Sequence, residues 1–98
     1  MCEADASTSA RPTVFVDNDR VRVTEWRFAP GAATGWHRHE FDYVVVPVTD
    51  GTLLLRTPDG EKQASLAMGQ PYFRKAGVEH DVINGGEAEL AFVEIEMK

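Results

Sequence analysis

The sequence has few of the residues that mark secreted, membrane or nucleic-acid-binding proteins. Its one cysteine, Cys2, has no partner for an intramolecular disulfide. No apolar run approaches the roughly 20 residues that a membrane helix needs. The first residues also show neither the basic start nor the apolar stretch of a secretion signal. We therefore expect a cytoplasmic protein without a membrane partner.

Basic residues are scarce as well. Ten lysines and arginines stand against 16 acidic residues, which gives a formal net charge of -6. Nucleic-acid binding depends on cationic contacts to phosphate, so this balance argues against a nucleic-acid partner. It favours a small-molecule substrate or another protein. The 98 residues are enough for one domain.

The sequence contains many short extended segments and no convincing amphipathic helix. Asp50-Gly51 and Asp59-Gly60, each between two such segments, are typical of hairpin turns. This pattern predicts an all-β fold, a sandwich or a barrel. We expect residues 1–12 to form a flexible arm, or one that folds over a partner subunit, and residues 13–98 to form the β-barrel domain.

Two segments depart from simple alternation. In residues 20–28 the apolar phase changes, which predicts a β-bulge near Thr24 and Glu25. Residues 43–48 are apolar at consecutive positions, so both faces of this strand should be covered. A barrel wall needs only one buried face, and the outer face of this strand therefore predicts a homodimer. The side chains expected in that interface are Val44, Val46 and Val48.

Two of the three histidines, His37 and His39, are separated by one residue. On an extended strand this spacing puts both imidazoles on one face. Two neutral imidazoles make half of a site for zinc or another divalent transition metal, whereas calcium and magnesium prefer oxygen ligands. The third histidine, His80, completes the site if its strand lies beside the first.

The spacing of these histidines and of the surrounding glycines resembles the two motifs of the cupin superfamily. The first motif is matched by Gly31, His37, His39 and Gly51, and the second by Gly69, Gly77, His80 and Asn84. The resemblance implies a single-domain cupin jelly-roll β-barrel. It spans residues 31–84, more than half of the chain.

The sequence departs from the cupin motifs at three places. Tyr43 occupies the position of the usual acidic ligand, the spacing to Gly51 is one residue longer, and Lys75 replaces a proline. The resemblance therefore favours the cupins with three histidine ligands, among which thiol dioxygenases and diketone-cleaving dioxygenases use ferrous iron. Zinc, nickel and manganese remain open as alternatives. Glu40 or Asp42 could act as the fourth ligand if a turn after His39 aimed it inward.

Other residues are candidates for catalysis and substrate binding. A tyrosine hydroxyl is a poor ligand at neutral pH but a good proton donor, so we assign Tyr43 a catalytic role beside a metal-bound substrate. Aromatic residues could line the pocket mouth, and an inward arginine could bind a substrate carboxylate. These expected substrate-binding residues are Trp36, Phe41, Phe73, Arg27 and Arg56. Arg38, between two inward histidines, should face away.

Three functions are compatible with these features. The sharpest hypothesis is a ferrous dioxygenase, an oxidoreductase acting on a small polar metabolite. The alternatives are a small-ligand sensor without turnover and a metal-dependent isomerase or lyase in which Tyr43 moves a proton. The run Asp42-Tyr43-Val44-Val45-Val46-Pro47 is also similar to small cupins grouped with β-alanine degradation, which indicates a pathway but no reaction.

Overall fold

The structure is a computed structural model of the chain and describes residues 9–98. These residues form strands and connecting turns with no helix, which confirms the all-β prediction. The strands are β1 (Arg11–Asp17), β2 (Val21–Phe28), β3 (His37–Arg38), β4 (Asp42–Pro47), β5 (Gly51–Thr57), β6 (Gly60–Leu66), β7 (Tyr72–Arg74), β8 (Glu79–Asn84) and β9 (Leu90–Met97). Accordingly, within residues 9–98 there is no long apolar helix that could cross a membrane.

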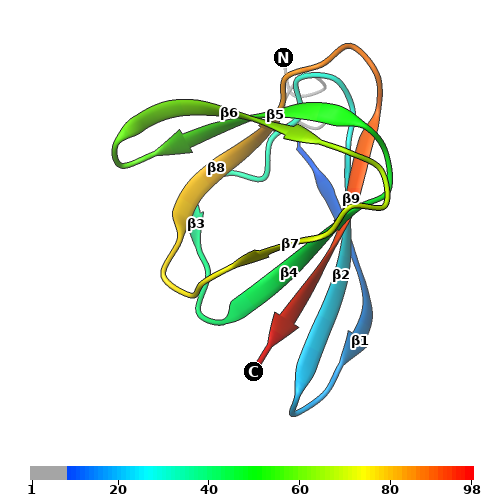
Figure 1. Cartoon of the computed structure of the whole chain (residues 1–98), viewed down its shortest axis with the longest axis vertical. Helices are drawn as coiled ribbons and strands as arrows, with labels where there is room; N and C mark the ends of the chain where they lie inside the picture. The colour runs from blue at the N-terminus through cyan, green and yellow to red at the C-terminus, as the bar shows by residue number, and fades with distance from the viewer. Residues whose placement is uncertain (1–8) are drawn as a thin grey trace.

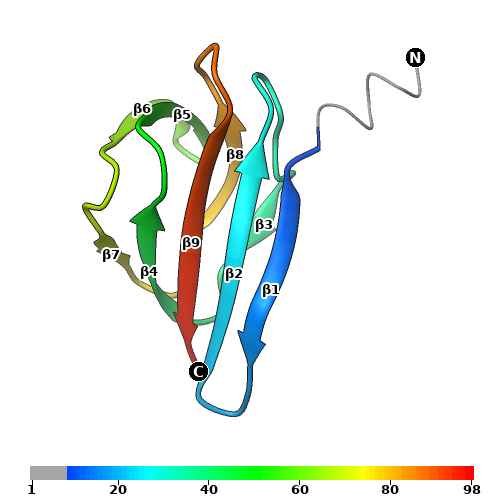
Figure 2. The same ribbon diagram turned by 90° about the vertical axis from the view of Figure 1, so that its right-hand side faces the viewer.

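The strands form two sheets that face each other. One sheet has the order β1-β2-β9-β4-β7 and the other the order β3-β8-β5-β6, and neighbouring strands within each are antiparallel. Figure 1 shows the two sheets closing around a central space, and Figure 2 shows the five-stranded sheet from outside with β9 at its centre. Strands distant in the sequence thus become neighbours, as β2 and β9 do.

The core fills one end of the space between the sheets. Its largest fully buried apolar side chains are Phe28, Tyr43 and Leu90, and the rings of Phe28 and Phe92 lie 5.4 Å apart between centroids. Burying each such side chain contributes about 1.5–3 kcal/mol. Asn84 is also fully buried because its amide donates hydrogen bonds to the carbonyls of Phe28, Ala29 and Ala88. This residue therefore ties the end of β8 to the core.

The bulge predicted near Thr24 and Glu25 is wrong. All eight residues of β2 pair with β9 without a shift of register. The apolar phase changes because the inward side chains of β2 are polar at one end, Arg22 and Thr24, and apolar at the other. A register shift occurs instead in β1, between Val14 and Val16.

Strand β1 begins at Arg11, so the last two residues of the expected arm belong to the five-stranded sheet. Ala10 also bonds to this domain, donating its N–H to the carbonyl of Ala33 at 2.9 Å. Residues 1–8 of the expected arm, with Cys2, lie outside the described residues.

Candidate metal centre

Strands β3 and β8 bring the three histidines together. His37 and His80 are directly opposite each other in this antiparallel pair. His39 follows the short strand, where its backbone N–H donates to Val78 and its carbonyl accepts from Gly77. Gly77 has a φ of 97°, a left-handed conformation that glycine adopts at no steric cost. The motif glycine therefore shapes the loop that holds His39 beside His80.

The three imidazoles converge, and two of them, His37 and His39, have the spacing of ligands around one ion. The ligand atoms of the three rings all lie within 4.8 Å of one another, and the Nε2 atoms of His37 and His39 are 3.2 Å apart. Two nitrogens bound to one zinc at about 2.0–2.1 Å are separated by about 3.0–3.4 Å. The carbonyl of Gly35, 2.9 Å from Nδ1 of His37, can only accept a hydrogen bond. Nδ1 therefore carries the proton, and Nε2 keeps its lone pair for a ligand.

The chemistry of the site fits a divalent transition metal. Burial, followed by the charge of His37, lowers the pKa of His39 to about 4, and the same two causes lead in lowering the pKa of His80 to about 4. Both rings are therefore neutral at pH 7, as metal ligands must be. Nε2 of His80 is buried without a hydrogen-bond partner. A lone pair left unpaired in this way is costly, and a bound metal would satisfy it.

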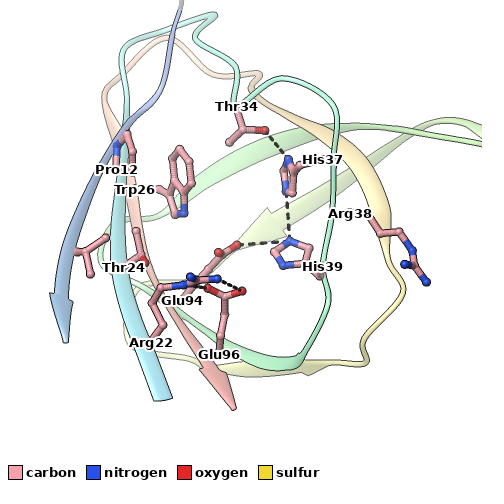
Figure 3. Close-up of a pocket in the computed structure, with 11 residues that line it drawn as sticks. Pro12, Arg22, Thr24, Trp26, Thr34, His37, Arg38, His39, Glu94 and Glu96 are labelled. Atoms are coloured by element: carbon pink, nitrogen blue, oxygen red, sulfur yellow. Dashed lines mark hydrogen bonds and ion pairs between the residues drawn. The ribbon is translucent and has the colours of Figure 1, made fainter. Parts of the chain in front are cut away.

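A cavity of about 360 Å³ lies against two of the histidines. In Figure 3, His37 and His39 face Trp26 and Glu94 across this space, and the Arg38 side chain points away from it, as parity predicts. The remaining lining residues are Pro12, Val14, Arg22, Thr24, Thr34 and Glu96, together with Arg38, which borders the cavity although its side chain points away. Arg22 and Glu96 form a two-pronged ion pair with contacts of 2.9 and 3.4 Å. We call this space the larger cavity.

Glu94, on β9, is a site residue that the sequence reading missed. Its carboxylate lies 3.9 Å from Nε2 of His39. Burial, followed by the charge of Glu96, raises the pKa of Glu94 to about 7. The signal was present in the sequence, because Glu94 and Glu96 share the parity of the buried Leu90 and Phe92. Two acidic residues on the inward face of a strand indicate a polar cavity wall.

Tyr43, the expected catalytic residue, lies directly beside the histidines. Its ring stacks on His39 with centroids 3.9 Å apart and an interplanar angle of 20°, and its side chain is fully buried. Burial and the charge of Glu94 raise the pKa of its hydroxyl, so Tyr43 stays protonated at neutral pH. Tyr43 also lines a cavity of about 20 Å³, the smaller cavity, together with His80, Arg74 and Glu94.

The two carboxylates expected as alternative fourth ligands, Glu40 and Asp42, do not face the histidines. Glu40 is exposed, and Asp42 is exposed with its carboxylate accepting the backbone N–H of Ala76 at 2.8 Å. The turn that would aim either inward is absent from this part of the described chain because β4 starts at Asp42 and puts Tyr43 on its inner face.

The expected substrate-binding residues line neither cavity. Arg27 and Arg56 have the opposite parity to the inward Phe28 and Leu55, so they face outward, where Arg27 pairs with Glu25 and Glu89 and Arg56 with Glu61. The indole of Trp36 donates to Glu79 at 3.2 Å. The remaining two, Phe73 and Phe41, are exposed and partly buried, respectively. The aromatic residue found in the larger cavity is instead Trp26.

Fold and site together define a two-sheet jelly-roll barrel with a candidate three-histidine metal centre. The family model described as Cupin domain matches residues 24–96, and the chain belongs to the cupin family. The chain is 68% identical over 89 residues to the beta-alanine degradation protein BauB of Pseudomonas aeruginosa, covering 91% of this chain and 94% of that one.

Solved structures agree with this assignment. A cupin domain from Bordetella pertussis is 60% identical, with a TM-score of 0.90 over 92% of this chain and 94% of that one. A cupin superfamily protein from Desulfitobacterium hafniense is 15% identical, with a TM-score of 0.71 over 91% of this chain and 77% of that one. The second likeness shows the fold alone.

Proposed function

We propose that this protein is a metal-dependent cupin enzyme that binds one divalent transition metal and oxidises a small polar metabolite with dioxygen. The most specific form of the proposal assigns ferrous iron as the metal. The observation that carries the proposal is the convergence of His37, His39 and His80, with neutral rings at His39 and His80 and a buried, unpartnered Nε2 on His80. A bound ferrous ion would supply Lewis-acid and one-electron chemistry there.

The residues around the centre have separate tasks in this proposal. The three imidazoles hold the ion, and the carbonyl of Gly35 fixes the ring of His37 in the tautomer that binds. The Tyr43 hydroxyl, protonated at neutral pH, holds a proton at the inner side of the centre. Trp26 and Thr24 give the larger cavity an apolar and a polar patch that orient a substrate.

The substrate is small and arises in β-alanine breakdown. A cavity of about 360 Å³ lies at the lower end of the range for small-molecule sites. The 68% identity to a beta-alanine degradation protein over nearly the whole of both chains supports the assignment to that process. We therefore choose β-alanine itself as the first probe.

The test combines metal analysis with oxygen uptake. Protein purified without chelator and loaded with ferrous iron should hold about one equivalent of metal and consume oxygen when β-alanine is added. His80→Ala should lose most of the metal and the uptake. Arg38→Ala is the matched control because this side chain lies between the two paired histidines yet points away from the cavity.

The other outcomes separate the alternative functions. Turnover of the probe by zinc-loaded protein without oxygen would replace the oxygenase with an isomerase or lyase. Binding of the probe by calorimetry without turnover would support a sensor. Full metal content in His80→Ala would overturn the three-histidine centre itself.

A further inference from the structure

Glu94 lies between the two cavities that surround the histidines. His37 and His39 line the larger cavity, and His80 lines the smaller one. Among residues 9–98, Glu94 is the one residue that lines both. Its carboxylate therefore borders the histidine cluster on the side that faces β9, opposite β3 and β8.

The charge of Glu94 has no cationic side chain of its own among residues 9–98. Arg22, on the neighbouring strand, is bonded through two nitrogens to Glu96. Glu94 instead lies 3.9 Å from the neutral His39 ring, and its carboxylate also accepts a hydrogen bond from the Trp26 side chain. A carboxylate whose side chain is only 10% exposed needs a compensating charge nearby, because burying a lone ion is costly. A divalent cation at the histidines would supply that charge.

The distance from Glu94 to His39 is compatible with one shared ion. Two ligand atoms each bound at about 2.1 Å can be at most about 4.2 Å apart. The observed 3.9 Å falls inside this limit. The carboxylate is not among the atoms that lie within 4.8 Å of one another, so a direct bond takes a rotation of the Glu94 side chain. The cavities on both sides of this side chain give it room to rotate.

We propose that Glu94 is the acidic ligand of the metal centre, supplied from β9 in place of the carboxylate missing at position 43. This assignment of Glu94 rests on the three-histidine centre of the proposed function and adds a fourth protein ligand to it. Tyr43 fills the usual acidic position with a ring stacked on His39, and Glu94 adds the negative charge from another strand. A bound ion would then have three histidine ligands and one anionic ligand.

The test measures cobalt(II) binding to the full chain, by competition titration and by the visible absorption of the bound ion. Removing a carboxylate that supports a metal typically lowers metal affinity by about 10–100-fold. Glu94→Gln should lower the cobalt affinity by that factor and change the absorption spectrum. Glu94→Asp keeps the charge but is one methylene shorter, so it should also lose affinity. Circular dichroism checks that each variant is folded.

The controls distinguish a direct bond between Glu94 and the metal from the effect of a negative charge that lies nearby. Glu40→Gln removes the same charge next to His39, but Glu40 is exposed, so cobalt affinity and spectrum should stay unchanged. Wild-type affinity and spectrum in Glu94→Gln would overturn the proposal, as would a normal affinity in Glu94→Asp. A crystal structure of the cobalt-loaded protein should place a Glu94 oxygen about 2.0–2.2 Å from the ion.

The same titration distinguishes failure of this proposal from failure of the metal centre. If His80→Ala loses cobalt and Glu94→Gln does not, the three-histidine centre stands and the role of Glu94 is overturned. If the wild-type protein binds no cobalt, both proposals are overturned.

Discussion

Glu94 carries an energetic cost when no cation is bound. Burial raises its pKa from 4.5 to about 7, so between these values the folded protein binds more protons at this residue than the unfolded chain does. The contribution of Glu94 to stability therefore falls as pH rises from 4.5 to 7, and the full penalty remains above pH 7. A functional carboxylate in this position lowers the stability of the metal-free fold.

This cost predicts that Glu94→Gln stabilises the metal-free protein above pH 7. The gain over wild type should be near zero below pH 4.5 and reach about 1–3 kcal/mol at pH 8. Urea unfolding with chelator at pH 4.5, 6 and 8 measures it. His39 and His80 titrate in both proteins, so their effect cancels in the comparison. Glu40→Gln should show no such gain because Glu40 is exposed. Equal stability of Glu94→Gln and wild type at pH 8 would contradict the prediction.

The sequence specified the histidines better than the acidic residue. The pairing of His37 and His39 follows from spacing, since i and i+2 share a face, and the resemblance to the second cupin motif places His80 beside them. Glu94 does not follow in this way, because the carboxylates that the motif suggests as ligands, Glu40 and Asp42, lie next to His39 in the sequence. What brings Glu94 to the site is the pairing of β4 with β9, where Val45 lies opposite Glu94. Such a long-range register is not encoded in any local pattern.

At the scale of single strands, the change from polar to apolar side chains on the inward face of β2 was interpreted as a change in which side chains point inward. The phase change in β2 was interpreted as a bulge because its apolar side chains were taken to mark the inward face along the whole strand. Arg22 and Thr24 face the larger cavity, so the strand stays regular. The irregular strand is β1, where Val14 pairs with the inward Thr24 and Val16 with the outward Val23. Alternation alone cannot distinguish solvent from a polar cavity.

The first residue of β5, Gly51, is the last glycine of the first cupin motif, although it lies one residue later than the motif requires. The packing around it explains why this position is a glycine. A Cβ at Gly51 would overlap Cδ1 of Leu90, which is fully buried at the start of β9. We predict that Gly51→Ala lowers the free energy of unfolding by about 1–3 kcal/mol, since overpacking forces the neighbours apart. Urea unfolding measures the change.

The matched variant for this prediction is Gly86→Ala. A Cβ there would meet Oδ1 of Asn84 at 3.5 Å, which is an ordinary contact, so stability should change little. If Gly51→Ala unfolded at the same urea concentration as Gly86→Ala, the tight packing of β5 on β9 would not be a constraint.

At the scale of the molecule, the five-stranded sheet has an apolar row on its outer face. Val16 pairs with Val23, Val23 with Ile95, Ile95 with Val44, and Val44 with Phe73. Paired residues in an antiparallel sheet face the same side, so one apolar side chain from each strand contributes to the row. The sequence indicated only the β4 part of this surface, because the other strands join it through long-range pairing. Figure 2 shows this sheet from its outer side.

This row leads us to propose a homodimer in which two five-stranded sheets pack face to face. Phe73 and Val16, at the two ends of the row, are 50% and 40% exposed, and a second copy would cover them. Light scattering should therefore give twice the 10.9 kDa mass of the chain.

Val44→Lys tests the homodimer because it puts a charge in the middle of the row. We expect it to raise the dimer dissociation constant at least about tenfold, since a charge buried between apolar faces is costly. Met68→Lys is the control, because Met68 is 64% exposed in the turn between β6 and β7 and lies outside the row. It should leave the dimer intact. Sedimentation velocity at several concentrations separates the two variants. A wild-type monomer at high concentration, or equal dissociation constants for the two variants, would place the interface elsewhere or remove it.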